Sequence, residues 1–367
     1  MTNREKEILK WIEENPFISQ SELAEKADIA RSSVAVHISN LIKKGKIIGK
    51  GYIIQKKSFV SVIGGTNIDI SAQSYSSLRD YDSNPGKVNT SFGGVGRNIA
   101  DNLSRLDQDV ELITVLGDDF NSEEIKRNCK SLGINISNSL MIPNSPTSTY
   151  ISILDDNNDM KLAISAMDLY DNLTIDFIKS KKEILDESKL CIIDTNIPEE
   201  TIKYIVDNFS IPLFLDCVST TKALKIKNFI GKFHTIKPNR IEAEFLSGID
   251  IIDQNSLEKC ANFFIQKGVK QVFISLGEKG VFYSNGETSG HMKPFKTEVV
   301  NTTGAGDAFM SGIAYSYLEN LDIIESCKNG IACAAIAISS EKTISDNMSL
   351  ENINRIKEEN LWIWQNI

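Results

Sequence analysis

The sequence predicts an α/β fold, in which helices cover both faces of a mostly parallel sheet, preceded by a small helical domain. Strand-like runs alternate with helical stretches from residue 59 onward, and this alternation is typical of parallel sheets. Two polar, strand-rich stretches, about 70–92 and 145–168, interrupt it. Residues 1–57 carry 11 Lys and Arg against 7 Asp and Glu, and the remainder carries 29 against 42. We therefore expect a basic domain over 1–57 and an acidic domain over 58–367, with different partners.

Three helices and a hairpin are predicted in the basic domain. The spacing of apolar residues predicts a first helix over residues 4–14. Ser21 is the expected N-cap of a second helix over 22–26, and a third helix should span 31–43. The alternating residues 45–54 predict a short hairpin.

This order of elements is that of the winged helix-turn-helix, and the segment resembles the many bacterial regulators that carry this module. In such a module the third helix enters the major groove of DNA with its first residues toward the base edges. The resemblance implies base contacts for Arg31, Ser32, Ser33 and His37. The lysines that could contact phosphate are Lys43, Lys44, Lys46 and Lys50. A small protein-interaction domain with a solvated basic face is the alternative, and pattern and charge together favour DNA.

The larger domain opens with a strand over residues 59–63, which runs directly into two glycines. Further strands are predicted at 190–193, 212–215, 234–236 and 271–276. The two polar stretches could form a small sheet that projects from this domain as a lid.

The strongest functional signal is the run Asn301-Thr-Thr-Gly-Ala-Gly-Asp-Ala-Phe309, followed by the apolar pattern of a buried helix. Gly304, Ala305 and Gly306 then lie at the N-terminus of that helix, where free backbone N–H groups and the helix dipole bind anions. Asp307 could accept a proton from a substrate hydroxyl while these amides stabilise a transferring phosphoryl group. A glycine turn with an ordinary acidic residue at the start of a helix is the alternative.

A second glycine-rich run, Gly93-Gly-Val-Gly-Arg-Asn98, precedes a helix expected over 99–106. As a dinucleotide fingerprint it is weak, because it lacks the third glycine and no apolar strand leads directly into it. The sequence contains no G-x-x-x-x-G-K-[ST] motif, which excludes a P-loop kinase.

The same run is better interpreted together with the upstream run Gly64-Gly-Thr-Asn-Ile-Asp69. The two runs supply three polar side chains that could contact sugar hydroxyls: Asn67, Asp69 and Asn98. Gly93 and Gly94 would let the sugar lie against the backbone.

These motifs, in this order and spacing, resemble the ribokinase-like (PfkB) carbohydrate kinase family over about residues 59–345. The resemblance implies a doubly wound α/β domain with a β-rich lid. It also implies ATP and magnesium (Mg2+), and phosphorylation of a primary hydroxyl of a sugar or nucleoside. Asp307 matches the catalytic base of the family, and residues 304–306 match its anion hole. Lids in this family often pair, so a homodimer is expected.

Two further segments match the nucleotide side of the family. Asn239 and Glu242 look like its N-x-x-E element, which organises magnesium and phosphate through water, with Glu242 toward the metal. A helix start with Asn as N-cap and Glu at the third position is the alternative. The residues expected beside the nucleotide are Ser275, Gly277, Gly280 and Thr303.

The chain departs from the family in one region. Many relatives have Asp where this chain has Asn301, and a glycine-bearing loop where it has residues 339–345. In relatives this region holds the activating monovalent cation, so the resemblance gives no prediction for potassium (K+) here.

Within the family the chain is most similar to the pseudouridine kinases, some of which also carry an N-terminal helix-turn-helix. The similarity lies in residues 82–86, 91–100, 145–150 and 159–164. It implies phosphorylation of the 5′-hydroxyl of pseudouridine, with Asp69 and Asn98 on the ribose. Asn89 or Thr149 could face the base, and ordinary solvent-facing polarity is an equal alternative for both.

Two functions are alternatives to that of a pseudouridine kinase. One is a kinase for ribose, fructose or a deoxy-keto acid. The other is a sugar-sensing transcriptional regulator without turnover, although a sensor need not keep an intact catalytic base.

Composition suggests a cytoplasmic protein. The six cysteines are scattered without a C-x-x-C pair, so we expect reduced, mostly buried thiols. The N-terminus is too charged for a signal peptide. No apolar run approaches the ~20 residues that a membrane span needs, so we expect no membrane partner.

Overall fold

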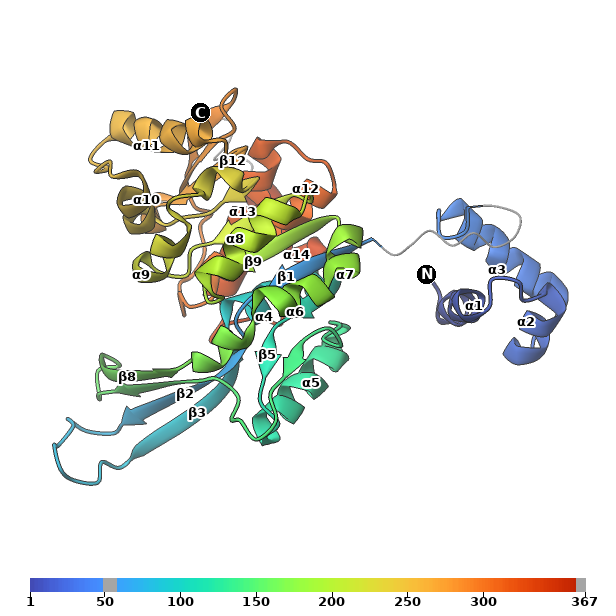
Figure 1. Ribbon diagram of the computed structural model, residues 1–367, viewed down its shortest axis with the longest axis horizontal. Coiled ribbons are helices and arrows are strands. Elements are labelled where there is room, and N and C mark those ends of the chain that lie inside the picture. The colour runs from blue at the N-terminus through green and yellow to red at the C-terminus, as the bar shows by residue number, and fades with distance from the viewer. Residues whose placement is uncertain (49–57, 361–367) are drawn as a thin grey trace. The chain divides into compact units, whose positions relative to one another are not determined.

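The computed structural model describes residues 1–48 and 58–360 and divides the chain into two compact units, Met1–Ser58 and Phe59–Ile367 (Figure 1). Each unit buries a hydrophobic core of its own. Within the described ranges, every helix is too short or too polar to cross a bilayer. All six cysteines are buried, as expected.

The N-terminal unit consists of α1 (Asn3–Glu14), α2 (Gln20–Ala27) and α3 (Arg31–Lys43). Each helix turns an apolar stripe toward a shared core. The buried residues of this core are Ile8, Leu9, Ile12, Ile18, Leu23, Val34, Ile38, Leu41 and Ile47. The structure confirms the predicted bounds of α3, whereas residues 49–54 of the predicted hairpin lie outside the described residues.

The start of α2 differs from the prediction. Ser19 is its N-cap: the Ser19 hydroxyl accepts a hydrogen bond from the Glu22 backbone N–H, and the Glu22 carboxylate accepts one from the Ser19 N–H. This reciprocal capping box needs an acidic or amide side chain three residues after the cap. Ser21 has Ala24 at that position, so the prediction of Ser21 as the cap is wrong.

An eight-stranded sheet forms the centre of the larger unit, in the order β14-β13-β12-β11-β10-β9-β1-β4. Its strands are β1 (Phe59–Ile63), β4 (Asp109–Ile113), β9 (Leu190–Asp194), β10 (Leu213–Asp216), β11 (Thr235–Ile236), β12 (Gln271–Ser275), β13 (Val281–Ser284) and β14 (Ser289–Met292). Neighbours from β4 to β12 are parallel, and β13 and β14 add an antiparallel edge. The sheet is therefore mostly parallel, as predicted.

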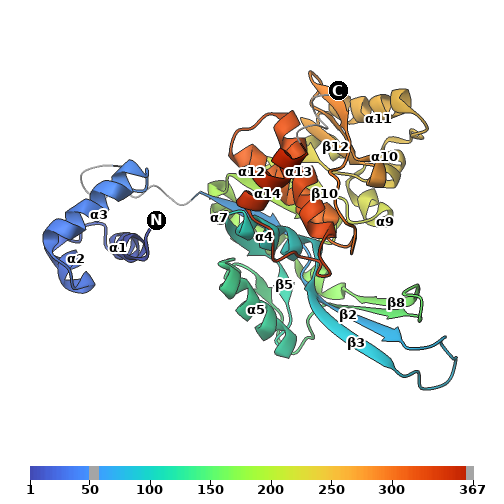
Figure 2. The same cartoon turned by 180° about the vertical axis from the view of Figure 1, so that it is seen from behind.

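Helices cover both faces of this sheet (Figures 1 and 2). One face packs against α4 (Val95–Arg105), α5 (Phe120–Leu132), α12 (Ala305–Leu318), α13 (Ile323–Ile338) and α14 (Leu350–Glu359). The other packs against α6 (Ile175–Ser180), α7 (Lys182–Glu187), α8 (Glu199–Asn208), α9 (Thr220–Ala223), α10 (Arg240–Ser247) and α11 (Gln254–Lys267). Strands covered on both faces are buried throughout, which explains their nearly continuous apolar sequence.

The two polar stretches form a second sheet of four strands, in the order β3-β2-β7-β8. Its strands are β2 (Asn67–Ser74), β3 (Gly86–Gly93), β7 (Thr149–Leu154) and β8 (Met160–Ala166). This sheet extends away from the α/β body (Figures 1 and 2). A short parallel pair, β5 (Val115–Leu116) and β6 (Leu140–Met141), completes the unit.

Candidate active site

The candidate site lies where the carboxyl ends of the parallel strands meet. The chain passes from β1 to β4 on one side and later returns to β9 on the other side of β1. Such a reversal of strand order opens a crevice at the carboxyl edge, where ligands bind in open α/β sheets. Gly64 follows β1 directly, and Asp194 and Asp216 end β9 and β10.

Asp194 ties the two glycine runs together. Its carboxylate accepts hydrogen bonds from the backbone N–H groups of Gly65 (2.7 Å), Gly96 (2.9 Å) and Asn196 (2.8 Å). A Cβ on Gly64 would overlap this carboxylate, which explains the glycine there. Burial raises the pKa of Asp194. No role was predicted for this residue, although an acidic residue that ends an apolar strand was a visible signal.

Helix α4 begins at Val95, four residues before the predicted start at residue 99. Gly94 is its N-cap, with φ of 96°, and a Cβ there would overlap the Gly65 carbonyl. The glycines therefore permit close backbone contacts at the helix start and do not delay the helix. As a result Asn98 lies in the first turn of α4.

Asn98 and Asp307 meet although 209 positions separate them in the chain. The Asn98 side-chain Nδ2 donates a hydrogen bond of 2.9 Å to Asp307 Oδ2, and both residues are buried. Asp307 lies in the first turn of α12, whose N-cap Gly304 has φ of 83°. The predicted base thus lies beside the predicted sugar-contacting residue.

The start of α12 presents backbone N–H groups that have no acceptor within the helix. Gly304 offers no side chain to cap them. Within the described part of the chain, the contact at these N–H groups is a long one, of 3.4 Å, from the Ala305 N–H to the Thr302 carbonyl. Gly306 follows in the same turn. These residues match the predicted anion-binding position.

Burial is the main influence on the Asp307 carboxyl and raises its pKa to about 8. The neighbouring Asp216 carboxylate acts in the same direction, whereas the Asn98 hydrogen bond and the Lys237 ammonium favour the charged form. A carboxyl group with such a pKa can exchange a proton near neutral pH, as a general base must.

Asn67 and Asp69 form a pair at the base of the four-stranded sheet. The Asn67 side-chain amide donates a hydrogen bond of 2.6 Å to Asp69 Oδ1. A Cβ on Gly93 would overlap the Asp69 carboxylate, so the glycine leaves room for it. Burial raises the pKa of Asp69, and the hydrogen bond from Asn67 partly opposes this.

The register of this sheet separates Asn89 from Thr149. Residues opposite each other on paired strands project to the same face. Asn89 is opposite Ser71, two residues from Asp69, and therefore shares the face of Asp69. Thr149 is opposite Ile68 and lies on the other face, where its hydroxyl donates to the Thr147 carbonyl. The structure does not bring Thr149 to the side of Asp69, since one residue along a strand reverses the face.

Hydrogen bonds hold together the segments that are predicted to lie beside the nucleotide. Asn239 and Glu242 form a capping box at the start of α10, with both hydrogen bonds at 2.9 Å, as the structural alternative predicted. Burial raises the pKa of the Glu242 carboxyl. The Ser275 N–H donates to the Pro238 carbonyl, which links the end of β12 to this box.

The loop after β12 turns through two glycines. Gly277 has φ of 60° and Gly280 has φ of 94°, and both belong to the left-handed region that favours glycine. A Cβ on Gly280 would overlap the Met292 carbonyl. Thr303 lies separately, in the turn before α12, where its N–H donates to Asn301 Oδ1.

Asn301 links that turn to the loop that follows α13. Its side-chain amide donates a hydrogen bond of 3.1 Å to the Glu341 carbonyl. A Cβ on Gly304 would overlap the Thr343 carbonyl. The loop of residues 339–345 therefore packs directly on the first turn of α12.

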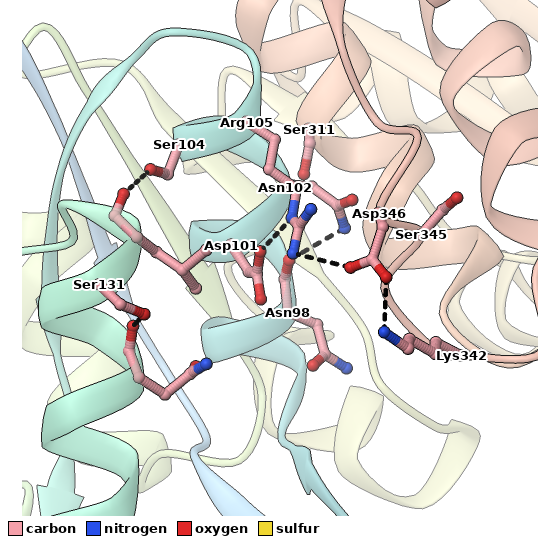
Figure 3. A network of polar contacts seen from close by, with 12 residues as sticks. Asn98, Asp101, Asn102, Ser104, Arg105, Ser131, Ser311, Lys342, Ser345 and Asp346 are labelled. Atoms are coloured by element: carbon pink, nitrogen blue, oxygen red, sulfur yellow. Dashed lines mark hydrogen bonds and ion pairs between the residues drawn. The ribbon is translucent and has the colours of Figure 1, made fainter.

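A polar network ties the same loop region to α4 (Figure 3). Asp101 accepts hydrogen bonds of 2.7 Å from Arg97 and Arg105. Arg105 also lies 3.6 Å from the Asp346 carboxylate, which Lys342 contacts as well. This network links α4, which carries Asn98, to the segment that follows the loop packed on the start of α12.

In the N-terminal unit the start of α3 is exposed. Arg31, Ser32 and Ser33 are accessible, whereas His37 is partly buried and its buried Nδ1 has no hydrogen-bond partner among the described residues. Val36 is 59% exposed on the outer side of the helix, and it was not among the predicted DNA-contacting residues.

The lysines near the end of α3 are not equivalent. The Lys44 ammonium lies 2.6 Å from the buried Glu5 carboxylate, so an internal contact occupies this predicted phosphate ligand. Lys43 and Lys46 are exposed, and Lys50 lies outside the described residues.

Comparison with known proteins gives a family match for each unit. The pfkB family carbohydrate kinase profile matches residues 57–350. The winged helix-turn-helix DNA-binding profile matches residues 1–48.

Two proteins of Escherichia coli (strain K12) are each 37% identical to the chain. One is a sugar kinase named YeiI, described as uncharacterized, which aligns over 96% of this chain and 98% of its own length. The other is a pseudouridine kinase, which aligns over 83% of this chain and 98% of its own length. Among solved structures, a ribokinase from Thermotoga maritima has a TM-score of 0.72 and 26% identity, covering 82% of this chain and 99% of its own.

Proposed function

Because the chain belongs to the pfkB family of carbohydrate kinases, we propose that it transfers the terminal phosphoryl group of ATP to the 5′-hydroxyl of pseudouridine. The observation that carries the proposal is the contact between Asn98 and Asp307 at the start of α12. It places a carboxyl group of raised pKa, a polar side chain for the sugar and an anion-binding helix end within one turn of each other. The 37% identity to a pseudouridine kinase supports the choice of nucleoside.

In the proposed reaction Asp307 accepts the proton of the 5′-hydroxyl as the hydroxyl oxygen attacks. The backbone N–H groups of residues 304–307 stabilise the charge on the transferring group, and ATP supplies the phosphoryl group itself. General-base help is typically worth ~10²–10⁴ in rate, and one such donor ~10²–10³.

The ribose is proposed to lie between the two sheets of the kinase unit. Asn67, Asp69 and Asn98 offer carboxylate and amide groups to its hydroxyls, with Gly93 and Gly94 at its back. Asn89 is proposed to face the base, because it shares the face of Asp69. Thr149 is not assigned to the substrate, because it lies on the opposite face.

Magnesium is proposed to be held mainly by phosphates and water, with Glu242 as the protein group nearest to it. Mg2+ usually keeps several waters and binds through one or two carboxylates plus phosphates. The chemistry of Glu242 fits this role, because its buried carboxyl group has a raised pKa that a nearby cation would lower. The residues proposed to line ATP are Asn239, Ser275, Gly277, Gly280 and Thr303.

ATP consumption across candidate substrates tests the proposal. Purified protein should form ADP with pseudouridine. Uridine is the matched control, because its base is joined to ribose through N1 in place of C5 and so lacks the free N1–H donor of pseudouridine. We expect kcat/KM for pseudouridine to exceed that for uridine about 10- to 100-fold, the usual cost of one lost hydrogen bond at a polar site. A preference for ribose, fructose or a deoxy-keto acid would favour the other kinases. ATP binding without turnover on any substrate would favour a sugar-sensing regulator.

A second proposed function is DNA binding by the N-terminal unit, which the winged helix-turn-helix match and the excess of basic residues support. Arg31, Ser32 and Ser33 are proposed to reach base edges, with Val36 beside them against a thymine methyl group. His37 is assigned a packing role in place of base contact, because its side chain is partly buried. The combination suggests a cytoplasmic kinase that regulates its own synthesis.

Replacing Arg31 with Ala should weaken specific DNA binding about 5- to 100-fold, the usual cost of one base contact. A gel-shift assay with the full chain and DNA from upstream of its own coding sequence would measure this. Arg4→Ala is the matched control, since Arg4 is an exposed arginine of α1 that pairs with Glu7. Equal losses in the two variants, or no binding by the unmodified protein at low salt, would contradict the proposal.

A homodimer is proposed to form through the lid sheet. The face opposite Asp69 exposes Val88 (65%), Leu162 (54%) and Ile164 (55%). Exposed apolar side chains gathered on one face of a sheet mark interaction surfaces. Ile164→Asp should therefore convert a dimer into a monomer, as measured by sedimentation.

Ala163→Asp is the matched control for this change. Ala163 neighbours Ile164 on the same strand but projects to the other face, so the dimer should persist. Dissociation of both variants, or of neither, would argue against this surface.

A further inference from the structure

A buried lysine stands beside the proposed anion-binding helix end. Lys237 follows β11 directly at the carboxyl edge of the sheet, and its side chain is 8% exposed. Its Nζ lies 3.2 Å from the position that a Cβ on Gly306 would occupy. The ammonium group therefore reaches the first turn of α12, where a Cβ on Gly306 would be in tight contact with it.

Three carboxyl groups share this one ammonium group. The Asp216 Oδ2 lies 3.1 Å from Nζ, and Glu242 and Asp307 act on it electrostatically. Burial alone would lower the pKa of Lys237, but the three acidic neighbours outweigh burial and raise it, so the group stays charged.

A purely structural role explains this arrangement poorly. Removing a charged pair from water costs several kcal/mol, and well-packed apolar side chains often serve stability equally well. An ammonium group has three N–H donors, and among the described residues Asp216 is the one carboxylate within ion-pair distance. The remaining donors can serve an anion at the start of α12.

We propose that Lys237 is a catalytic residue that donates a hydrogen bond to a non-bridging oxygen of the phosphoryl group as it passes from ATP to substrate. The inference rests on the proposed phosphoryl transfer at Asp307. In that step the bond from the terminal phosphorus to the ADP oxygen breaks, and a bond to the substrate oxygen forms. The substrate proton goes to Asp307, while Lys237 keeps its protons throughout. Asp216 holds the ammonium group in place and acts as a positioning residue.

The test separates ATP from ADP, because ADP lacks the group that Lys237 contacts. Lys237→Met should weaken ATP binding about 10- to 100-fold, as expected for a lost hydrogen bond to a charged group. Its ADP binding should stay within about twofold of the unmodified protein. Calorimetry on the full chain measures both affinities without turnover, and kcat should fall about 10²- to 10³-fold.

Two further variants keep the test decisive. Lys237→Met combined with Asp216→Asn removes the charge from both members of the buried ion pair, and it should show the same selective loss of ATP affinity. Lys232→Met removes another lysine that pairs with an aspartate, Asp207, and should change neither affinity.

Equal losses for ATP and ADP, or an unchanged ATP affinity, would overturn the role of Lys237. If Lys237→Met behaves in this way while Asp307→Asn still abolishes turnover, only the inference fails. Normal turnover in Asp307→Asn would instead remove the proposed function.

Discussion

Replacing Asp307 with Asn is expected to lower kcat at least ~10²-fold, because the amide cannot accept the substrate proton. The variant keeps the size and the neighbours of the side chain, so ATP and pseudouridine should still bind. Steady-state assays of ADP formation give kcat and KM, and calorimetry gives the ATP affinity. Near-normal turnover would remove Asp307 from its proposed role.

Stability provides the control for this variant. The folded protein raises the pKa of Asp307 above its unfolded value, so the contribution of this group to stability is lost as pH rises toward about 8. A neutral Asn avoids that loss, and Asp307→Asn should unfold at the same temperature as the unmodified protein or at a higher one above pH 7. A lower unfolding temperature would mean that the loss of activity reflects damage to the fold.

Replacing Gly304 with Ala is expected to lower kcat about 10²- to 10³-fold, comparable to the loss of one backbone donor to the transferring group. Gly304 has φ of 83°, and its added Cβ would overlap the Thr343 carbonyl. The first turn of α12 must then shift, which moves its N–H groups and Asp307 together. ADP formation at saturating substrates measures the loss.

Gly133→Ala is the control that shows whether backbone strain alone, without movement of the first turn of α12, lowers kcat. Gly133 also has a positive φ, 76°, at the end of α5, but no atom lies within 4 Å of an added Cβ. It should therefore show a similar backbone strain with normal kcat. If Gly304→Ala kept normal kcat, or if both variants lost activity equally, the start of α12 would have no special role in the reaction.

The sequence predicted the elements that carry strong local signals. The bounds of α3 and β1 match the structure, because the apolar pattern of α3 ends at Lys43 and the apolar run of β1 lies between Ser58 and Gly64. The sequence also predicted that Asp307 lies at the start of a buried helix, directly after a glycine-rich turn. In each case the information lies within about a dozen consecutive residues.

Local signals that compete were harder to interpret. Two serines preceded α2, and only the capping box of Ser19 with Glu22 distinguishes the true cap from Ser21. The start of α4 was placed too late, because glycine usually disfavours helices. Here Gly96 permits contact with the loop after β1, which outweighs that preference.

The charged cluster at the sheet edge was beyond sequence analysis. Asp194 and Asp216 end two strands and Lys237 follows a third, and the order of those strands in the sheet brings the three residues together. The position of Thr149 depends in the same way on strand register, which a single sequence does not specify. The predicted roles of the remaining site residues stay predictions that substrate and variant measurements must test.

The pH dependence of kcat/KM for pseudouridine tests the central claim most directly, since this ratio reports the ionisation of essential groups in the free enzyme. The base is inactive when protonated, so the ratio should rise with pH and level off above an apparent pKa of about 8. A profile that stays flat from pH 6 to pH 10, or one that falls across that range, would contradict a buried carboxylate base at position 307.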